Sequence, residues 1–168
     1  MSPRSLGWEW TLLLAISIAC GACGSSGSGK PLDDEADVQR LFETIAPTVA
    51  LLLAERLTEF EQKEYPDCPG GGTLWVDSAG TYVNLTRCTI EGITIDGKTT
   101  LFTVGEAPAA TVTLGGTFVI SGSLTGTLVV DNATFSGKDG RLCWSATGAV
   151  QDGPPFDVRS QDQSCDQG

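Results

Sequence analysis

Residues 111–130, TVTLGGTFVISGSLTGTLVV, decide the fold, because apolar side chains alternate there with threonine, serine and glycine. An alternation with a period of two is typical of a β-strand that buries one face. The same alternation recurs on both sides of this stretch, at Leu74 and Val76, Val83 and Leu85, Ile93 and Ile95, Leu101 and Thr103, Val112 and Leu114, Phe118 and Ile120, and Leu128 and Val130. The sequence therefore predicts an antiparallel meander over residues 67–152, with Asp96-Gly97 as its strongest candidate for a hairpin turn.

A helical period comes before the meander, in residues 33–66. The apolar positions at helical spacing are Val38, Leu41, Phe42, Ile45, Val49, Leu52, Leu53, Leu57 and Phe60. Acidic residues from Asp33 to Asp37 suit the positive end of a helix dipole, and Tyr65-Pro66 ends the pattern. Pro47 interrupts it, so we expect a kinked helix, or two helices.

The two periods together indicate an α+β domain. The aliphatic face of the sheet needs a cover, and the N-terminal helix is the obvious candidate. We expect a kinked helix packed on a curved, half-barrel-like antiparallel meander, whose threonine-rich face is either solvated or lines a site.

Six cysteines are present, and Cys68, Cys88, Cys143 and Cys165 lie in the body of the chain. An even set of four suits an oxidising compartment and allows three connectivities. The simplest is Cys68–Cys88 with Cys143–Cys165, in which the second bond ties down a polar C-terminal tail, residues 153–168. Each closed loop is worth about 3 kcal/mol in the chain-entropy model.

The first residues have the features of an export signal. Arg4 precedes an apolar core at residues 10–18, which is about half the length of a membrane-spanning helix. Small residues and two cysteines follow, so residues 1–19 are predicted to be a cleaved signal peptide.

Ser17-Ile18-Ala19-Cys20 resembles the lipobox of bacterial lipoproteins, and Cys20-Gly21-Ala22-Cys23 is an alternative match. The resemblance implies an acyl anchor, including palmitate, on Cys20 or on Cys23, and a place on a membrane of the bacterial cell envelope. The local motif favours Cys20, whereas an even number of remaining thiols favours Cys23. Residues 20–32, rich in glycine and serine, then form a flexible tether. An ordinary secretory signal that ends in cysteines is the other interpretation.

Composition limits the classes of function. The chain has 168 residues, of which 40% are hydrophobic and 18% charged, as expected for one globular domain, and its net charge is −11. That charge disfavours nucleic acid and anionic membrane surfaces as partners, so membrane attachment has to come from the lipid. The sequence contains no histidine, which excludes a Ser-His-Asp triad and histidine-ligated metals, and we expect no metal or cofactor.

Residues 92–99, from Gly92 to Thr99, match the P-loop pattern Gly-x4-Gly-Lys-Thr. A P-loop needs a flexible turn followed by a helix, but Ile93-Thr94-Ile95 and the residues after Thr99 are typical of strands. We therefore predict a chance match and no nucleotide binding.

Three aromatic residues, Trp75, Tyr82 and Trp144, allow two interpretations. They could form a small patch on the face opposite Leu74 for a carbohydrate or an apolar ligand, but filling the edges of the core is the favoured reading.

These observations predict a non-enzymatic lipoprotein that serves as a binding or structural module of the cell envelope. A carrier of a lipid or other hydrophobic ligand is an alternative, and it requires a pocket near Leu53, Leu57 and Phe60. A hydrolase that uses carboxylates is a further alternative, and it requires two acids that converge in one cleft with at least one raised pKa.

Overall fold

The computed structural model describes residues 29–58, 68–77, 79–104, 111–138, 140–162 and 165. The predicted signal peptide, Cys20, Cys23 and most of the predicted tether lie outside these residues. The elements are β1 (Lys30–Pro31), α1 (Glu35–Thr58), β2 (Thr73–Val76), β3 (Tyr82–Ile90), β4 (Ile93–Val104), β5 (Thr111–Gly122), β6 (Leu124–Lys138), β7 (Arg141–Val150) and β8 (Pro155–Arg159).

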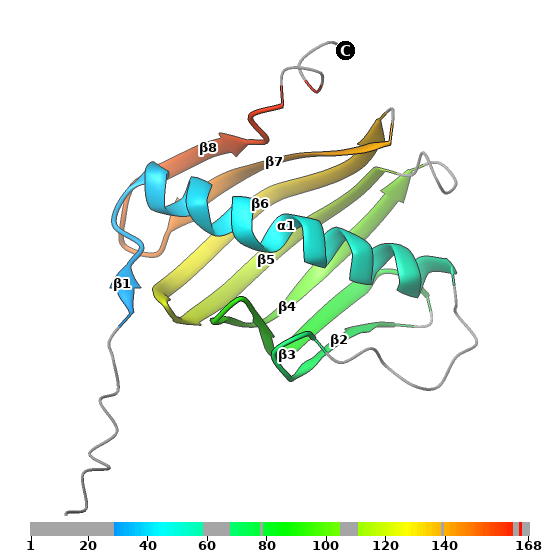
Figure 1. Cartoon of the computed structure of the whole chain (residues 1–168), viewed down its shortest axis with the longest axis horizontal. Helices are drawn as coiled ribbons and strands as arrows, with labels where there is room; N and C mark the ends of the chain where they lie inside the picture. Colours follow the sequence, from blue (N-terminus) through cyan, green and yellow to red (C-terminus); the bar gives the residue numbers. More distant parts are fainter. Residues whose placement is uncertain are drawn as a thin grey trace, which may run out of the picture.

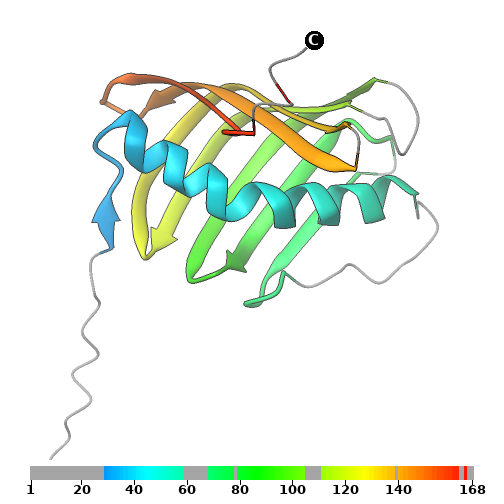
Figure 2. The same cartoon turned by 45° about the horizontal axis from the view of Figure 1, so that its top comes forward.

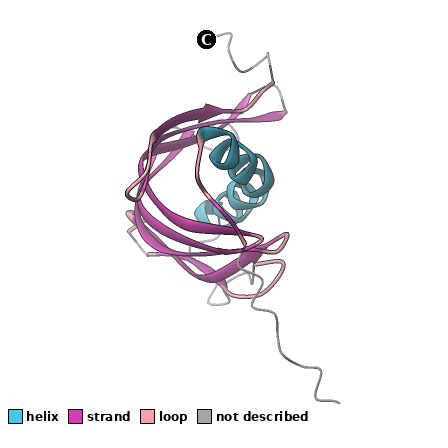
Figure 3. Ribbon diagram, turned by 90° about the vertical axis from the view of Figure 1, so that its left-hand side faces the viewer, coloured by secondary structure: helices cyan, strands magenta, loops and turns pink. Residues whose placement is uncertain are grey.

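One curved antiparallel sheet forms most of the domain. Strands β2 to β8 lie side by side in sequence order, and the short β1 adds to β6 in parallel (Figure 1). The sheet bends around α1, which lies at its open side (Figures 2 and 3). The inward residues of the strands and the apolar stripe of α1 form one hydrophobic core. The structure is thus an α+β fold with a curved meander, as the alternation predicts.

Helix α1 is a single element that runs through Pro47. Its first turn is capped by Asp34, whose Oδ1 accepts a hydrogen bond of 2.9 Å from the backbone N–H of Asp37. The alternative of two separate helices is therefore wrong for residues 35–58. A kink at Pro47 stays a prediction, and the part of the predicted helical segment that follows residue 58 lies outside the described residues.

The hairpin turn predicted at Asp96-Gly97 is wrong. Both residues lie inside β4, and the β3–β4 turn is at Glu91-Gly92. The pair serves a β-bulge instead: the Asp96 carboxylate accepts a hydrogen bond of 2.8 Å from the N–H of Arg87, which has a φ of 49° where the β3–β4 register shifts. Gly97 is required because a Cβ there would lie 2.6 Å from the carbonyl oxygen of Thr117.

The polar tail predicted for residues 153–168 is also wrong in part, because β8 lies within it. Phe156 and Val158 point into the core from β8. The free edge of this strand is bonded at its last residue by Gln39 of α1, whose amide donates to the Arg159 carbonyl at 2.8 Å and accepts from the Arg159 N–H at 3.2 Å. The side chain thus pairs with β8 as a neighbouring strand would, which protects the edge.

Two disulfides join parts of the domain. Cys68, just before β2, is bonded to Cys88 of β3, and Cys143 of β7 is bonded to Cys165. The Cα–Cα distances are 5.3 and 5.5 Å, within the usual range. These are the same two pairs as in the simplest connectivity.

Candidate functional site

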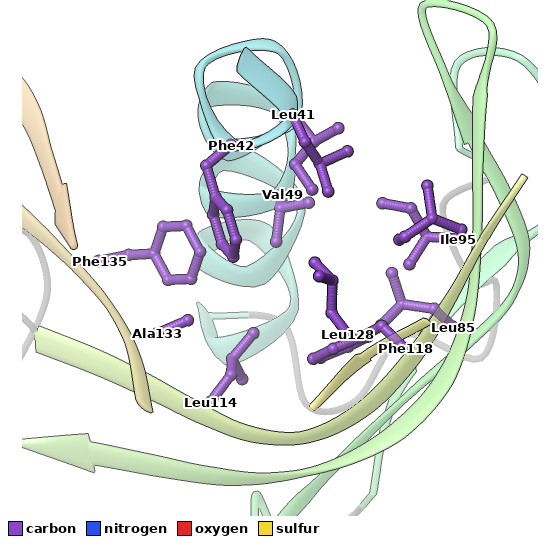
Figure 4. A pocket seen from close by; sticks show the side chains of 12 residues that line it. Leu41, Phe42, Val49, Leu85, Ile95, Leu114, Phe118, Leu128, Ala133 and Phe135 are labelled. Atoms are coloured by element: carbon purple, nitrogen blue, oxygen red, sulfur yellow. The ribbon is translucent and has the colours of Figure 1, made fainter. Parts of the chain in front are cut away.

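An apolar cavity of about 40 Å³ lies between α1 and the concave face of the sheet (Figure 4). About 10–15 Å³ is enough for one water molecule, but a site without polar partners stays dry. Every residue around the cavity is apolar: Leu41, Phe42, Ile45, Val49, Leu85, Ile95, Leu114, Phe118, Ile120, Leu128, Ala133 and Phe135.

The helical spacing of apolar residues in α1 and their alternation in the strands bring these side chains to the cavity. On α1, Leu41, Ile45 and Val49 are four residues apart, so they lie on one face of the helix. On the strands, alternation turns every second side chain inward. In β5, for example, Phe118 and Ile120 line the cavity, whereas Val119 is 51% exposed on the outer face.

The helix is held mainly at the edges of the sheet. Its backbone lies close to β2 and β3 on one side and to β6, β7 and β8 on the other. On the β7–β8 side, the Phe42 ring stacks on Trp144 with 5.7 Å between ring centroids and lies 6.3 Å from Phe156. Side chains of the middle strands β4 and β5 line the cavity.

One of the residues that line the cavity, Ala133 of β6, has a small side chain. Its neighbour across the β6–β7 ladder is Ala146, which is also buried but does not line the cavity. Protein cores rarely keep voids larger than a water molecule, and a void of this size costs about 1 kcal/mol. A larger side chain at position 133 would fill it.

The residues named for a carrier site are not those that line the cavity. Leu53 is buried in the core, Leu57 packs against the core, and Phe60 lies outside the described residues. The cavity borders an earlier part of the same stripe, Leu41 to Val49. The signal available in the sequence was the small Ala133 among large inward-facing residues.

The proposed patch of Trp75, Tyr82 and Trp144 is wrong, since the structure does not bring the three together. Trp144 belongs to β7 and is buried against Phe42, so its interpretation as a core residue is confirmed. Trp75 and Tyr82 belong to β2 and β3, near the other edge of the sheet. The Lys98 ammonium lies 5.0 Å above the Tyr82 ring, which is a cation–π contact.

Among the described residues, two carboxyl groups have a displaced pKa. The hydrogen bond from the Lys30 ammonium holds the pKa of Asp37 below its usual value. The backbone N–H of Tyr82, together with Thr81, does the same for the pKa of Asp77. Both shifts favour the ionised form, which is the opposite of what a general acid needs at neutral pH.

The remaining sequence candidates can be placed as well. Residues 92–99 form the end of a turn and the first part of β4, so no helix follows the P-loop-like letters. The described residues contain no group of three or more cysteine or acidic side chains that could hold a metal ion. Within the same part of the chain, no helix is both long and apolar enough to span a bilayer. Comparison with protein-family models, curated proteins and solved structures found no match.

Proposed function

We propose that this protein is a lipid-anchored, non-enzymatic member of the bacterial cell envelope that binds an acyl chain, or another slender hydrophobic ligand, between α1 and the concave face of the sheet. The observation that carries the proposal is the cavity between these elements, which has an entirely apolar lining. It favours the carrier interpretation over a purely structural module, because a structural module gains nothing from a void in its core.

The cavity is smaller than the 300–1,000 Å³ typical of ligand sites, so we propose that it enlarges when the ligand enters. A displacement of α1 is the simplest way, since its backbone lies closer to the strands on both sides of the sheet than to the middle strands β4 and β5. Pro47 cannot donate to the Glu43 carbonyl, and the bend predicted there would ease the displacement. Each methylene that enters gains about 0.8 kcal/mol, which offsets the cost of opening.

The location in the envelope rests on the N-terminal sequence and agrees with the two disulfides, which suit an oxidising compartment. The acidic domain gains no attraction to anionic lipids, so the acyl chains on Cys20, or on Cys23, would supply the membrane contact. We expect the mature N-terminal peptide to begin at one of these cysteines and to carry acyl chains in a mass spectrum. A mature N-terminus at any other residue would contradict the anchor.

The ligand proposal predicts opposite effects for two matched substitutions. Ala133→Leu fills the cavity, so it is expected to raise the free energy of unfolding by about 1 kcal/mol and to weaken acyl-chain binding at least about tenfold. Ala146→Leu adds the same atoms one strand away, at a buried position that does not line this cavity. It is expected to lower the free energy of unfolding by about 1–3 kcal/mol and to leave the affinity within about twofold.

The measurements are urea denaturation and titration with cis-parinaric acid, a fatty acid that becomes fluorescent in apolar surroundings. They use the mature chain, residues 20–168, exported by a bacterial host with Cys20→Ser and Cys23→Ser, so that no lipid anchor competes. If the wild-type mature chain does not bind the probe, or if Ala133→Leu binds it as well as Ala146→Leu does, the proposed function is wrong.

A further inference from the structure

The segment that leads into the domain, residues 29–32, is attached to the sheet beside the cavity. We call it the N-terminal segment. Its strand β1 pairs in parallel with the start of β6, beyond the end of β7. The backbone bonds that flank this pairing include Lys30 N–H to Ser123 O at 3.0 Å and Leu32 N–H to Thr125 O at 2.9 Å. The hydroxyl of Thr125 adds a bond of 3.2 Å to the Gly29 carbonyl. A strand of only two residues pairs over a shorter length than any strand of the meander, so it opens more readily.

Leu32 packs on the concave face of the sheet at Gly126, a position of β6 that has no side chain. A Cβ on Gly126 of β6 would lie only 3.2 Å from the Leu32 Cβ, so the leucine occupies the space that a side chain at 126 would need. Gly126 pairs with Ile120 and precedes Leu128 by two residues, and both of these line the cavity. Leu32, which is 3% exposed, thus closes the concave face beside the cavity.

The same segment is tied to the helix through charge. The Lys30 ammonium bonds Asp37 Oδ1 in the first turn of α1, and the Asp37 carboxylate is almost completely buried. Its second oxygen, Oδ2, is buried without a hydrogen-bond partner among the described residues. One exposed lysine therefore connects the position of the N-terminal segment to the start of the helix.

We propose that the N-terminal segment is the gate of the acyl-chain site: when residues 29–32 leave β6, Leu32 withdraws and the concave face opens beside Ile120 and Leu128. This inference rests on the proposed function and adds the route of ligand entry. Residues 20–28 precede the segment and span at most about 30 Å, so an anchor at Cys20 would keep the gate close to the membrane from which an acyl chain would come.

A kinetic experiment separates a gate from ordinary core packing. In stopped-flow binding and release of cis-parinaric acid by the mature chain, Leu32→Ala is expected to raise both the association and dissociation rate constants at least about tenfold, because it removes the buried contacts that hold the gate shut. The dissociation constant is expected to change by less than about threefold. Lys30→Met keeps the leucine and removes the ion pair, and it should raise both rates by a smaller factor.

Leu74→Ala is the matched control, because Leu74 is also fully buried but lies on β2 and does not line the cavity. It removes the same atoms and is expected to leave both rate constants unchanged. Equal rates in Leu32→Ala and Leu74→Ala would overturn the gate while leaving the binding site intact. If Leu32→Ala does not fold, unchanged rates in Lys30→Met overturn it. Failure of the wild-type chain to bind the probe would instead refute the proposed function, and the gate with it.

Discussion

Phe42→Ala is expected to lower the free energy of unfolding by about 3–5 kcal/mol. The ring is 6% exposed and joins α1 to the β7–β8 edge through Trp144 and Phe156. The substitution removes the buried area of a large side chain and enlarges the existing cavity, which Phe42 lines. It also removes the stacking of the Phe42 ring on Trp144, and this aromatic contact accounts for about 0.5–1.5 kcal/mol of the loss.

Urea denaturation followed by tryptophan fluorescence measures this effect. Phe102→Ala is the control, since Phe102 is 66% exposed on β4 and its loss should change the free energy of unfolding by no more than about 0.5 kcal/mol. Equal losses in the two variants would show that the Phe42 contacts do not hold the helix on the sheet.

Removing the two disulfides one at a time is expected to have unequal effects. The loops they close are similar, with sequence separations of 20 and 22 residues, so the unfolded chain gains similar entropy in each case, about 3 kcal/mol. Cys68 is buried and stays bonded to the backbone near Gly71 and Gly72. Cys68→Ala with Cys88→Ala should therefore cost the whole of that amount.

Cys165 is in a different position, because it follows β8 and adds no side chain to the described core. Once Cys143–Cys165 is gone, the segment after β8 gains freedom in the folded protein as well, which offsets much of the entropy gained by the unfolded chain. We expect Cys143→Ala with Cys165→Ala to cost about 1 kcal/mol or less. Denaturation of both double variants under oxidising conditions gives the comparison, and a larger loss for the second pair would contradict this account.

The sequence was sufficient to predict the meander and its cover, because both depend on periodicity. Alternation puts residues such as Phe118 and Ile120 on one face of their strand before its partners are known. The apolar residues of α1 likewise share one face, which has to be buried. The number and ends of the strands were harder to predict. Asp96-Gly97 is a typical turn sequence, but in the structure it lies inside β4. The Asp96 carboxylate there accepts a hydrogen bond at the β3–β4 bulge, and the neighbouring strand leaves no room for a Cβ at Gly97.

The sequence could predict that a site would lie between the helix and the sheet, but not which residues would line it. A space between helix and sheet follows from the fold class, but its place depends on where α1 crosses the curved sheet, and that is set by Phe42, Trp144 and Phe156 together. The role of Leu32 was missed because β1 is too short for any period, and its partner Gly126 contributes no side chain to a pattern. Residues 30–32 therefore had the appearance of a tether.

The proposed contacts between an acyl chain and the cavity walls are tested directly by isotope-filtered NOE spectroscopy, with ¹³C-labelled mature protein and unlabelled dodecanoic acid. We predict NOEs from the chain methylenes to the methyl groups of Ile95, Leu114 and Ile120, which line the cavity. No NOEs are expected to Val119 and Val129, which lie on the outer face of the same sheet. NOEs confined to these two valines, or none at all at saturating dodecanoic acid, would contradict a ligand site between helix and sheet.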